Sequence, residues 1–207
     1  MIALIDYGIG NLRSVRKALE HVGAGVRLTD DPAVILAADK VVLPGVGAFG
    51  DGMKGMREGG LVQVVKEVAA RGTPLLGICV GMQVLFEVGE EMGAHEGLGI
   101  LSGRVKRFPL THDQSSISGL KIPQTGWNQI HPCKDSPLFH GLPQGAYTYF
   151  NHGYYCAAQP EDTLATTEYG GEYPSIVGCG RVYGIQFHPE KSQHVGLLLL
   201  RNFVERG

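Results

Sequence analysis

The stretch Leu75-Leu-Gly-Ile-Cys-Val-Gly-Met-Gln83 carries the strongest structural signal in this chain of 207 residues. Its first four residues are typical of a short buried strand, and helical spacing begins at position 80. Between them lies Gly77-x-Cys79-x-Gly81, the thiol form of the tight strand-to-helix turn called a nucleophile elbow. Such a turn presents its central side chain and crowds the positions two residues away, where glycine fits. The stretch therefore predicts an α/β fold with Cys79 as a nucleophile.

A buried structural cysteine, flanked by glycines for close packing, is the alternative interpretation of Cys79, because cysteine is among the most frequently buried residues. The sequence context favours the nucleophile. The positive end of a helix dipole, together with a nearby imidazolium, favours the reactive thiolate form of a cysteine at a helix start.

The rest of the chain divides into two halves of different pattern. Apolar runs predict strands at 2–5, 26–28, 40–43 and 75–78, and helical spacing predicts helices at 12–22, 32–38, 61–70 and 80–88, the last ended by Gly89. Short β-like segments follow near 100–108, 120–131, 146–158, 162–167, 175–179 and 182–187, before a last helix at 195–204. We expect one domain over 1–207, an open and mostly parallel sheet flanked by helices, with an antiparallel β extension in the second half.

Composition excludes several classes of protein. The chain is 43% hydrophobic and 18% charged, as in ordinary globular proteins, and its formal net charge of −2 gives no attraction toward nucleic acid or an anionic membrane. Its four cysteines form no C-x-x-C pair, and its histidines have no metal-ligand spacing. We therefore expect no metal and no cofactor. The cysteine usage and an N-terminus without a signal-peptide pattern predict a cytoplasmic protein.

A base for the thiol is predicted near the C-terminus, in Val182-Tyr-Gly-Ile-Gln-Phe-His-Pro-Glu190. His188 precedes a proline and is therefore expected to be extended, so that Glu190 points the same way and orients the imidazole. Cys79, His188 and Glu190 then form a catalytic triad. Each residue taken alone has an alternative interpretation: His188 as a packed histidine at a strand end, and Glu190 as a solvated charge.

Two glycine-rich turns follow other predicted strands. In Leu43-Pro-Gly-Val-Gly-Ala-Phe49, the backbone N–H groups of Val46 and Gly47, together with that of Val80, are candidate donors to an oxyanion. A merely flexible connection explains the loop equally well. Gly8-x-Gly10 resembles the opening of a dinucleotide fingerprint but lacks its third glycine, so that it is a weak signal.

Several segments together resemble the class I, or triad, glutamine amidotransferases and, more narrowly, the glutaminase subunits of imidazole glycerol phosphate synthases. The segments are Asp6-Tyr-Gly-Ile-Gly-Asn-Leu12, Leu43-Pro-Gly-Val-Gly-Ala-Phe49, Gly77-Ile-Cys-Val-Gly-Met-Gln83, Gly126-Trp-Asn128, Tyr149-Phe-Asn-His152 and Gln186-Phe-His-Pro-Glu-Lys-Ser192. The resemblance covers nearly the whole chain and implies a flavodoxin-like sheet.

The resemblance also implies a reaction and a partner. L-Glutamine would be hydrolysed to glutamate and ammonia by Cys79, His188 and Glu190, and the ammonia would pass to a (β/α)₈-barrel cyclase subunit in a heterodimer. That subunit would form imidazole glycerol phosphate and an aminoimidazole carboxamide ribotide. The positions that match the family's glutamine-binding residues are Gly47, Gln83, Glu91, His152, Gly153 and Tyr154. The positions that match its partner interface are Asn11, Trp127, Tyr149 and Lys191. The loop of Pro44 to Gly47 is a candidate switch between the two subunits.

The chain departs from the family's pattern at two places. Gln124 and Thr125 stand where the family usually has His-Met, and Asn151 and Gly153 flank His152 in place of the more usual Val and Ser or Thr. Two other functions stay open at this point: a glutaminase that serves another synthase, such as pyridoxal phosphate synthase, and a non-catalytic subunit that only binds.

Overall fold

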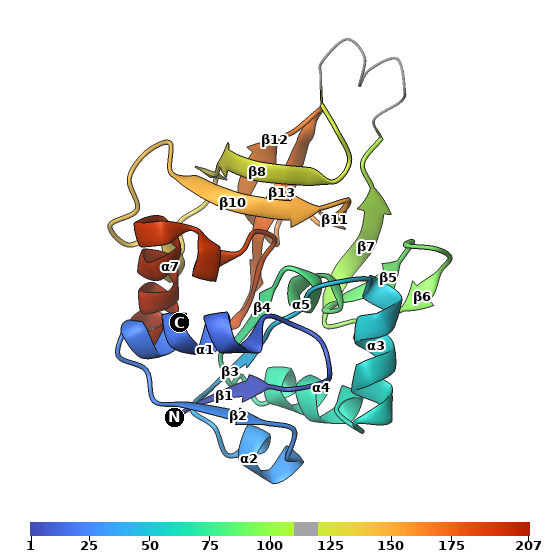
Figure 1. Cartoon of the computed structure of the whole chain (residues 1–207), viewed down its shortest axis with the longest axis vertical. Helices are drawn as coiled ribbons and strands as arrows, with labels where there is room; N and C mark the ends of the chain where they lie inside the picture. Colours follow the sequence, from blue (N-terminus) through green and yellow to red (C-terminus); the bar gives the residue numbers. More distant parts are fainter. Residues whose placement is uncertain (110–119) are drawn as a thin grey trace.

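A computed structural model describes residues 1–109 and 120–207 and is built around one large mixed sheet (Figure 1). The strand order across this sheet is β2-β1-β3-β4-β14-β13-β12-β9. Its parallel part consists of β1 (Ile2–Ile5), β2 (Val26–Thr29), β3 (Lys40–Leu43), β4 (Leu75–Ile78) and β14 (Val182–Ile185). The last strand comes from the second half of the chain, so both halves share one sheet.

Helices cover both faces of the parallel part. In the strand order, β2 lies on one side of β1, and β3 and β4 lie on its other side. The chain therefore changes direction across the sheet after β2. Because crossovers between parallel strands are right-handed, the helices before and after this change lie on opposite faces. Consistent with this, α1 packs against α7 and α2 against α4. The helices are α1 (Leu12–His21), α2 (Pro32–Leu36), α3 (Phe49–Glu58), α4 (Val62–Ala70), α5 (Val80–Gln83) and α7 (Gln193–Arg206). The predicted fold class is thereby confirmed.

The second half supplies the antiparallel extension. In the large sheet it contributes β13 (Glu172–Cys179), β12 (Thr163–Glu168) and β9 (His131–Pro132). A four-stranded sheet has the order β11-β7-β5-β6, with β11 (Tyr154–Ala158), β7 (Leu101–Arg107), β5 (Phe86–Gly89) and β6 (His95–Glu96). A two-stranded ribbon pairs β8 (Gln124–Gln129) with β10 (Tyr147–His152). Two 3-10 turns complete the fold, η1 (Pro137–Phe139) and η2 (Pro189–Lys191).

The predicted helix at 80–88 is wrong in its second half. Helix α5 ends at Gln83, and strand β5 follows at Phe86–Gly89. Phe86 is fully buried and pairs with Leu101 of β7, so that tertiary pairing overrides the local helical spacing. Gly89 is no helix cap: a Cβ there would press against the ring of Phe49.

Helix α3 was not expected from the sequence. Its ten residues, Phe49–Glu58, include glycines at 50, 52 and 55, which disfavour a helix. Packing explains two of them. A Cβ on Gly55 would overlap the carbonyl oxygen of Tyr7, and a Cβ on Gly52 would lie 3.2 Å from both Ile9 and Val80. The helix thus lies directly against the loop that follows β1.

In the described ranges, 1–109 and 120–207, no helix is long and apolar enough to cross a bilayer.

The close contact between α5 and the end of β3 leads to a stability prediction. A Cβ on Gly81 would overlap the backbone carbonyl of Leu43, which cannot move aside as a flexible side chain could. We expect Gly81→Ala to lower the free energy of unfolding by about 3 kcal/mol. Gly25→Ala is the matched control because a Cβ on Gly25 would meet nothing within 4 Å. Urea unfolding of both variants is the measurement, and equal stabilities would contradict the packing argument.

Candidate active site

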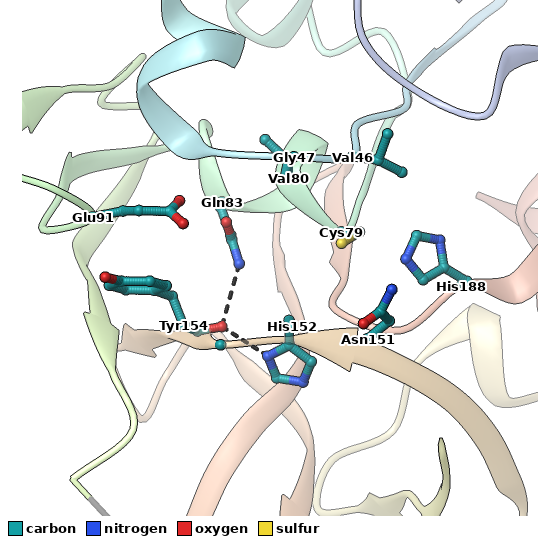
Figure 2. Close-up of a pocket in the computed structure, with 11 residues that line it drawn as sticks. Val46, Gly47, Cys79, Val80, Gln83, Glu91, Asn151, His152, Tyr154 and His188 are labelled. Carbon is teal, nitrogen blue, oxygen red and sulfur yellow. Dashed lines mark hydrogen bonds between the residues drawn. The ribbon is translucent and has the colours of Figure 1, made fainter. Parts of the chain in front are cut away.

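The candidate site lies where four parallel strands end. The residues that follow β1, β3, β4 and β14 are the loop at Tyr7, the loop of Pro44 to Gly47, Cys79 and His188. Carboxyl ends of neighbouring parallel strands meet at one edge of a sheet, and ligand sites of open α/β folds lie there. A pocket at this edge, drawn in Figure 2, is lined by Val46, Gly47, Cys79, Val80, Gln83, Glu91, Asn151, His152, Gly153, Tyr154 and His188.

Cys79 has the backbone of a nucleophile elbow. Its φ of 55° and ψ of −113° lie outside the ordinary regions for a side-chain-bearing residue, a strain typical of functional sites. Its N–H donates to the carbonyl of Ile185 at 2.8 Å, which fixes the turn on β14. A Cβ on Gly77 would lie 2.6 Å from the Gly81 carbonyl oxygen. The predicted turn and the reason for its glycines are therefore present, with Cys79 only 4% exposed at the pocket floor.

His188 and Glu190 form a buried pair beside the thiol. The imidazole Nδ1 lies 3.0 Å from Glu190 Oε1, and the two side chains are 3% and 1% exposed. Burial opposes a charge on the imidazole, but hydrogen bonds with Cys79 and Glu190, and the charges of both groups, raise the pKa of His188 to about 10. A protonated His188 beside the Cys79 sulfur is thus favoured at neutral pH, and it lies between that sulfur and the Glu190 side chain.

The local conformation of this pair differs in one respect from the sequence expectation. His188 is extended, as expected, with φ −97° and ψ 97°, but Glu190 belongs to the 3-10 turn η2 rather than to an extended segment. The proline at 189 starts that turn, and the turn itself, not strand alternation, brings the carboxylate back to the imidazole.

Strand β10 holds His188 from the side. The N–H of His188 donates to the Tyr149 carbonyl at 2.9 Å. The Ser192 hydroxyl donates to the carbonyl of His188 at 2.6 Å and accepts from the N–H of Tyr149 at 2.9 Å. The backbone of His188 is therefore held at its N–H by Tyr149 and at its carbonyl by Ser192.

The loop after β3 lies over the thiol. The Tyr7 hydroxyl donates to the Pro44 carbonyl, which anchors the start of the loop. Gly47 has a φ of +98°, a conformation that strongly favours glycine. Figure 2 shows Val46, Gly47 and Val80 on the same side of Cys79. Val80 is the first residue of α5, where backbone N–H groups have no partner within the helix.

The other end of the pocket is polar. The Gln83 side-chain NH₂ donates to the Tyr154 carbonyl and to Gln186 Oε1, both at 3.3 Å. Glu91 Oε2 accepts from the N–H of Phe49 at 2.8 Å, at the start of α3. Figure 2 places Glu91, Gln83 and Tyr154 on the side away from His188. The structure thus brings every predicted glutamine-binding residue into the pocket that holds Cys79.

Three of the four predicted interface residues lie together, next to the backbone of His188. The rings of Trp127 and Tyr149 meet edge to face at 6.0 Å, and Lys191 Nζ lies 5.8 Å from the centre of the Tyr149 ring. Trp127 is 47% exposed, the only tryptophan of the chain. Asn11 precedes α1, which packs against η2, the turn that contains Lys191.

Three residues to which the sequence patterns assigned no role also shape the site. Tyr7 anchors the loop at Pro44, Asn151 lines the pocket, and Gln186 receives the Gln83 amide and lies 4.0 Å from the Cys79 sulfur. Gln186 could have been noted because it stands two residues before His188 in an apolar strand. Within 1–109 and 120–207, no group of three or more His, Cys, Asp or Glu side chains is arranged to hold a metal ion. His112, one of the histidines considered for metal spacing, lies outside the described residues.

The fold and the site define an open α/β protein with a strained cysteine, a histidine and a glutamate at the carboxyl ends of its parallel strands. The family model "Glutamine amidotransferase class-I" matches residues 3–206, so the chain belongs to the class I glutamine amidotransferase family. The imidazole glycerol phosphate synthase subunit HisH of Symbiobacterium thermophilum is 51% identical over 203 residues, which cover 98% of this chain and 92% of that protein. The subunit of the same name from Desulfitobacterium hafniense is 50% identical over 204 residues, 98% of this chain and 93% of the relative.

Solved structures agree on the fold. The structure titled "Structure of PurLQS from Thermotoga maritima" matches with a TM-score of 0.75 at 21% identity, covering 98% of this chain and 96% of the matched one. At that identity the likeness concerns the architecture alone.

The environment of His188 leads to a prediction about pH. Because the glutamate contributes both a hydrogen bond and a negative charge, we expect Glu190→Gln to lower the pKa of His188 from about 10 toward 6.5. The folded-state pKa of His188 lies above its unfolded value of 6.5, so protonation of His188 contributes to the free energy of unfolding. This contribution is complete below pH 6.5 and is lost as the pH rises through 10. In the variant the contribution should be smaller, and its decline should be complete at lower pH. Histidine NMR titration and urea unfolding against pH are the measurements, and an unchanged His188 titration would contradict the assigned pairing.

Proposed function

We propose that this chain is the glutaminase subunit of an imidazole glycerol phosphate synthase and that residues 1–207 act as one domain. The observation that carries the proposal is the strained Cys79 turn, whose thiol lines one pocket with His188, which is itself paired with the buried Glu190. The named HisH relatives, about half identical over nearly the full chain, support the choice of synthase.

Glutamine hydrolysis follows from the positions of these groups. The Cys79 thiolate attacks the side-chain amide carbon of glutamine, and protonated His188 gives its proton to the leaving nitrogen, which departs as ammonia. A thioester joins Cys79 to the glutamyl group. His188, now neutral, takes a proton from water, whose oxygen attacks the thioester carbon and releases glutamate and the thiolate. Glu190 keeps the imidazole oriented and stabilises its positive charge.

The pocket supplies groups for both ends of the substrate. We assign the backbone N–H groups of Val46, Gly47 and Val80 to the oxyanion of the tetrahedral intermediate, since they lie beside Cys79. Glu91 and Gln83, with the backbone of 152–154, would hold the amino acid end of glutamine. The Glu91 carboxylate suits its ammonium group, and Gln83 Oε1 can accept from the same group, because the Gln83 NH₂ already donates to Tyr154 and Gln186.

The exposed edge beside the pocket is the proposed partner surface. It is a contiguous group formed by the rings of Trp127 and Tyr149 and the ammonium group of Lys191. Tryptophan and tyrosine are among the residues most enriched at protein interfaces. A (β/α)₈-barrel cyclase subunit bound there, as a heterodimer, would receive ammonia before it is protonated in water. The cyclase substrate is a nucleotide metabolite, so we also propose a cytoplasmic location.

Removal of the thiol tests the nucleophile. We expect Cys79→Ala to reduce glutamate release in the complex by more than about 10⁴-fold, because no covalent intermediate can form. Cys179→Ala is the matched control, since that thiol is exposed and outside the pocket. Release of glutamate from glutamine, with and without a cyclase subunit and its nucleotide, is the measurement.

Two results would contradict the assignment. Residual turnover in a folded Cys79→Ala protein would show that another group performs the attack. Full turnover by the isolated chain, unaffected by the cyclase subunit, would exclude the loop of Pro44 to Gly47 as a switch.

Trp127 tests the partner surface. We expect Trp127→Ala to weaken binding of the cyclase subunit at least about tenfold, as for a central aromatic residue of an interface. Leu28→Ala is the control, an exposed apolar residue on β2, which is an edge strand of the large sheet and does not belong to the β8–β10 ribbon. Isothermal titration calorimetry gives both affinities, and equal values for the two variants would place the interface elsewhere.

A further inference from the structure

A buried row of three polar side chains leads from β8 to the pocket wall. Gln124, Tyr173 and His152 are 2%, 2% and 6% exposed, although each carries polar groups. They come from β8, β13 and β10, and Gln124 stands directly opposite His152 in the β8–β10 pairing. Aromatic rings enclose them: the His152 ring lies 5.3 Å from that of Phe108 and 5.6 Å from that of Phe150. Such an enclosed row must satisfy its hydrogen bonds internally.

The first contact fixes the tautomer of His152. Its Nδ1 lies 2.7 Å from the Tyr154 carbonyl oxygen. A carbonyl oxygen can only accept, so Nδ1 carries the hydrogen. Burial lowers the pKa of His152 to about 4, so the ring is neutral at pH 7. Nε2 is consequently an acceptor that needs a donor.

The single proton of the Tyr173 hydroxyl decides the remaining contacts. The hydroxyl donates its proton to Gln124 Oε1 at 2.8 Å, and its oxygen lies 3.3 Å from His152 Nε2. In this arrangement Gln124 Nε2 is a buried donor with no partner in the described residues. Rotation of the Gln124 amide by 180° exchanges its two ends. Its NH₂ then donates to the Tyr173 oxygen, and the Tyr173 hydroxyl donates to His152 Nε2. This arrangement contains one more hydrogen bond, so it is the one that burial favours.

The far end of the row is part of the pocket wall. The Tyr154 carbonyl accepts from His152 Nδ1 and also from the Gln83 side chain at 3.3 Å, as the dashed lines in Figure 2 show. Gln83, Gly153 and Tyr154 all line the pocket, whereas Gln124 and Tyr173 do not. One carbonyl therefore joins the buried row to the Gln83 amide.

We propose that Gln124 and Tyr173 are positioning residues for glutamine, which act through His152 to hold the Tyr154 carbonyl and, with it, the Gln83 amide at the pocket wall. The inference rests on the proposed function and adds residues outside the pocket that determine glutamine affinity. Neither residue contacts Cys79, His188 or Glu190 in the described hydrogen bonds. Their removal therefore affects substrate binding rather than the chemical steps.

The kinetic experiment uses the complex with its cyclase subunit. We expect Gln124→Leu, which removes one hydrogen bond of the row, to raise KM for glutamine about fivefold. Tyr173→Phe removes two and should raise KM at least as much, and kcat should stay within about twofold of wild type in both variants. The double variant should be no worse than Tyr173→Phe, since both residues act through one ring. Gln124→His, which retains an N–H donor, should restore a near-normal KM. Tyr155→Phe is the matched control: it removes a hydroxyl from the same aromatic group, 6.0 Å away ring to ring.

Nitrogen NMR of protein labelled at histidine measures the hydrogen bonds of His152 independently of enzyme activity. Wild-type His152 should show a protonated Nδ1 and a hydrogen-bonded Nε2, and Tyr173→Phe should shift Nε2 alone toward the value of a free acceptor nitrogen. An unchanged KM in both single variants, or an Nε2 signal that Tyr173→Phe does not move, would overturn the inference while leaving the glutaminase assignment intact. A wild-type complex that does not hydrolyse glutamine would instead reject the proposed function and, with it, the role in glutamine binding.

Discussion

The close approach of backbone to backbone at the carboxyl ends of β1, β3 and β4 is the constraint on which the site depends. A Cβ on Gly81 would overlap the Leu43 carbonyl, and a Cβ on Gly55 would overlap that of Tyr7. A Cβ on Gly45 would lie 2.6 Å from the Gly81 nitrogen. Because no side chain separates these segments, the loop after β3 lies directly over the turn that carries Cys79. Many of the chain's glycines are thus explained by contact distance rather than by flexibility.

The two buried histidines of the pocket show how surroundings set charge. Burial disfavours the charged form of both. His188 has a thiol and a carboxylate as partners, and their hydrogen bonds and negative charges raise its pKa to about 10. His152 has only a carbonyl and a phenol, so burial prevails and its pKa falls to about 4. One imidazole is therefore suited to transferring protons, and the other to holding fixed hydrogen bonds as a neutral ring.

The sequence predicts the parts of the site that depend on neighbours along the chain. The glycines around Cys79, the proline after His188 and the alternation of strands with helices are local patterns, and the structure contains each of them. It does not predict α3 or the strand at Phe86–Gly89, since close packing and long-range pairing override local preference there. Tyr7 and Gln186 were missed for a related reason: their hydrogen bonds to Pro44 and Gln83 join residues distant in the chain.

Strand β10 connects the exposed edge with the interior of the site. At Tyr149 its side chain lies between Trp127 and Lys191, while its backbone carbonyl holds the N–H of His188. Three residues later the same strand ends at His152, whose ring supports the pocket wall. The pairing of β10 with β8 sets Tyr149 opposite Trp127 and His152 opposite Gln124. One pair of strands therefore fixes the register of the exposed aromatic rings and of the buried row, because a slip of one residue would turn every side chain to the other face.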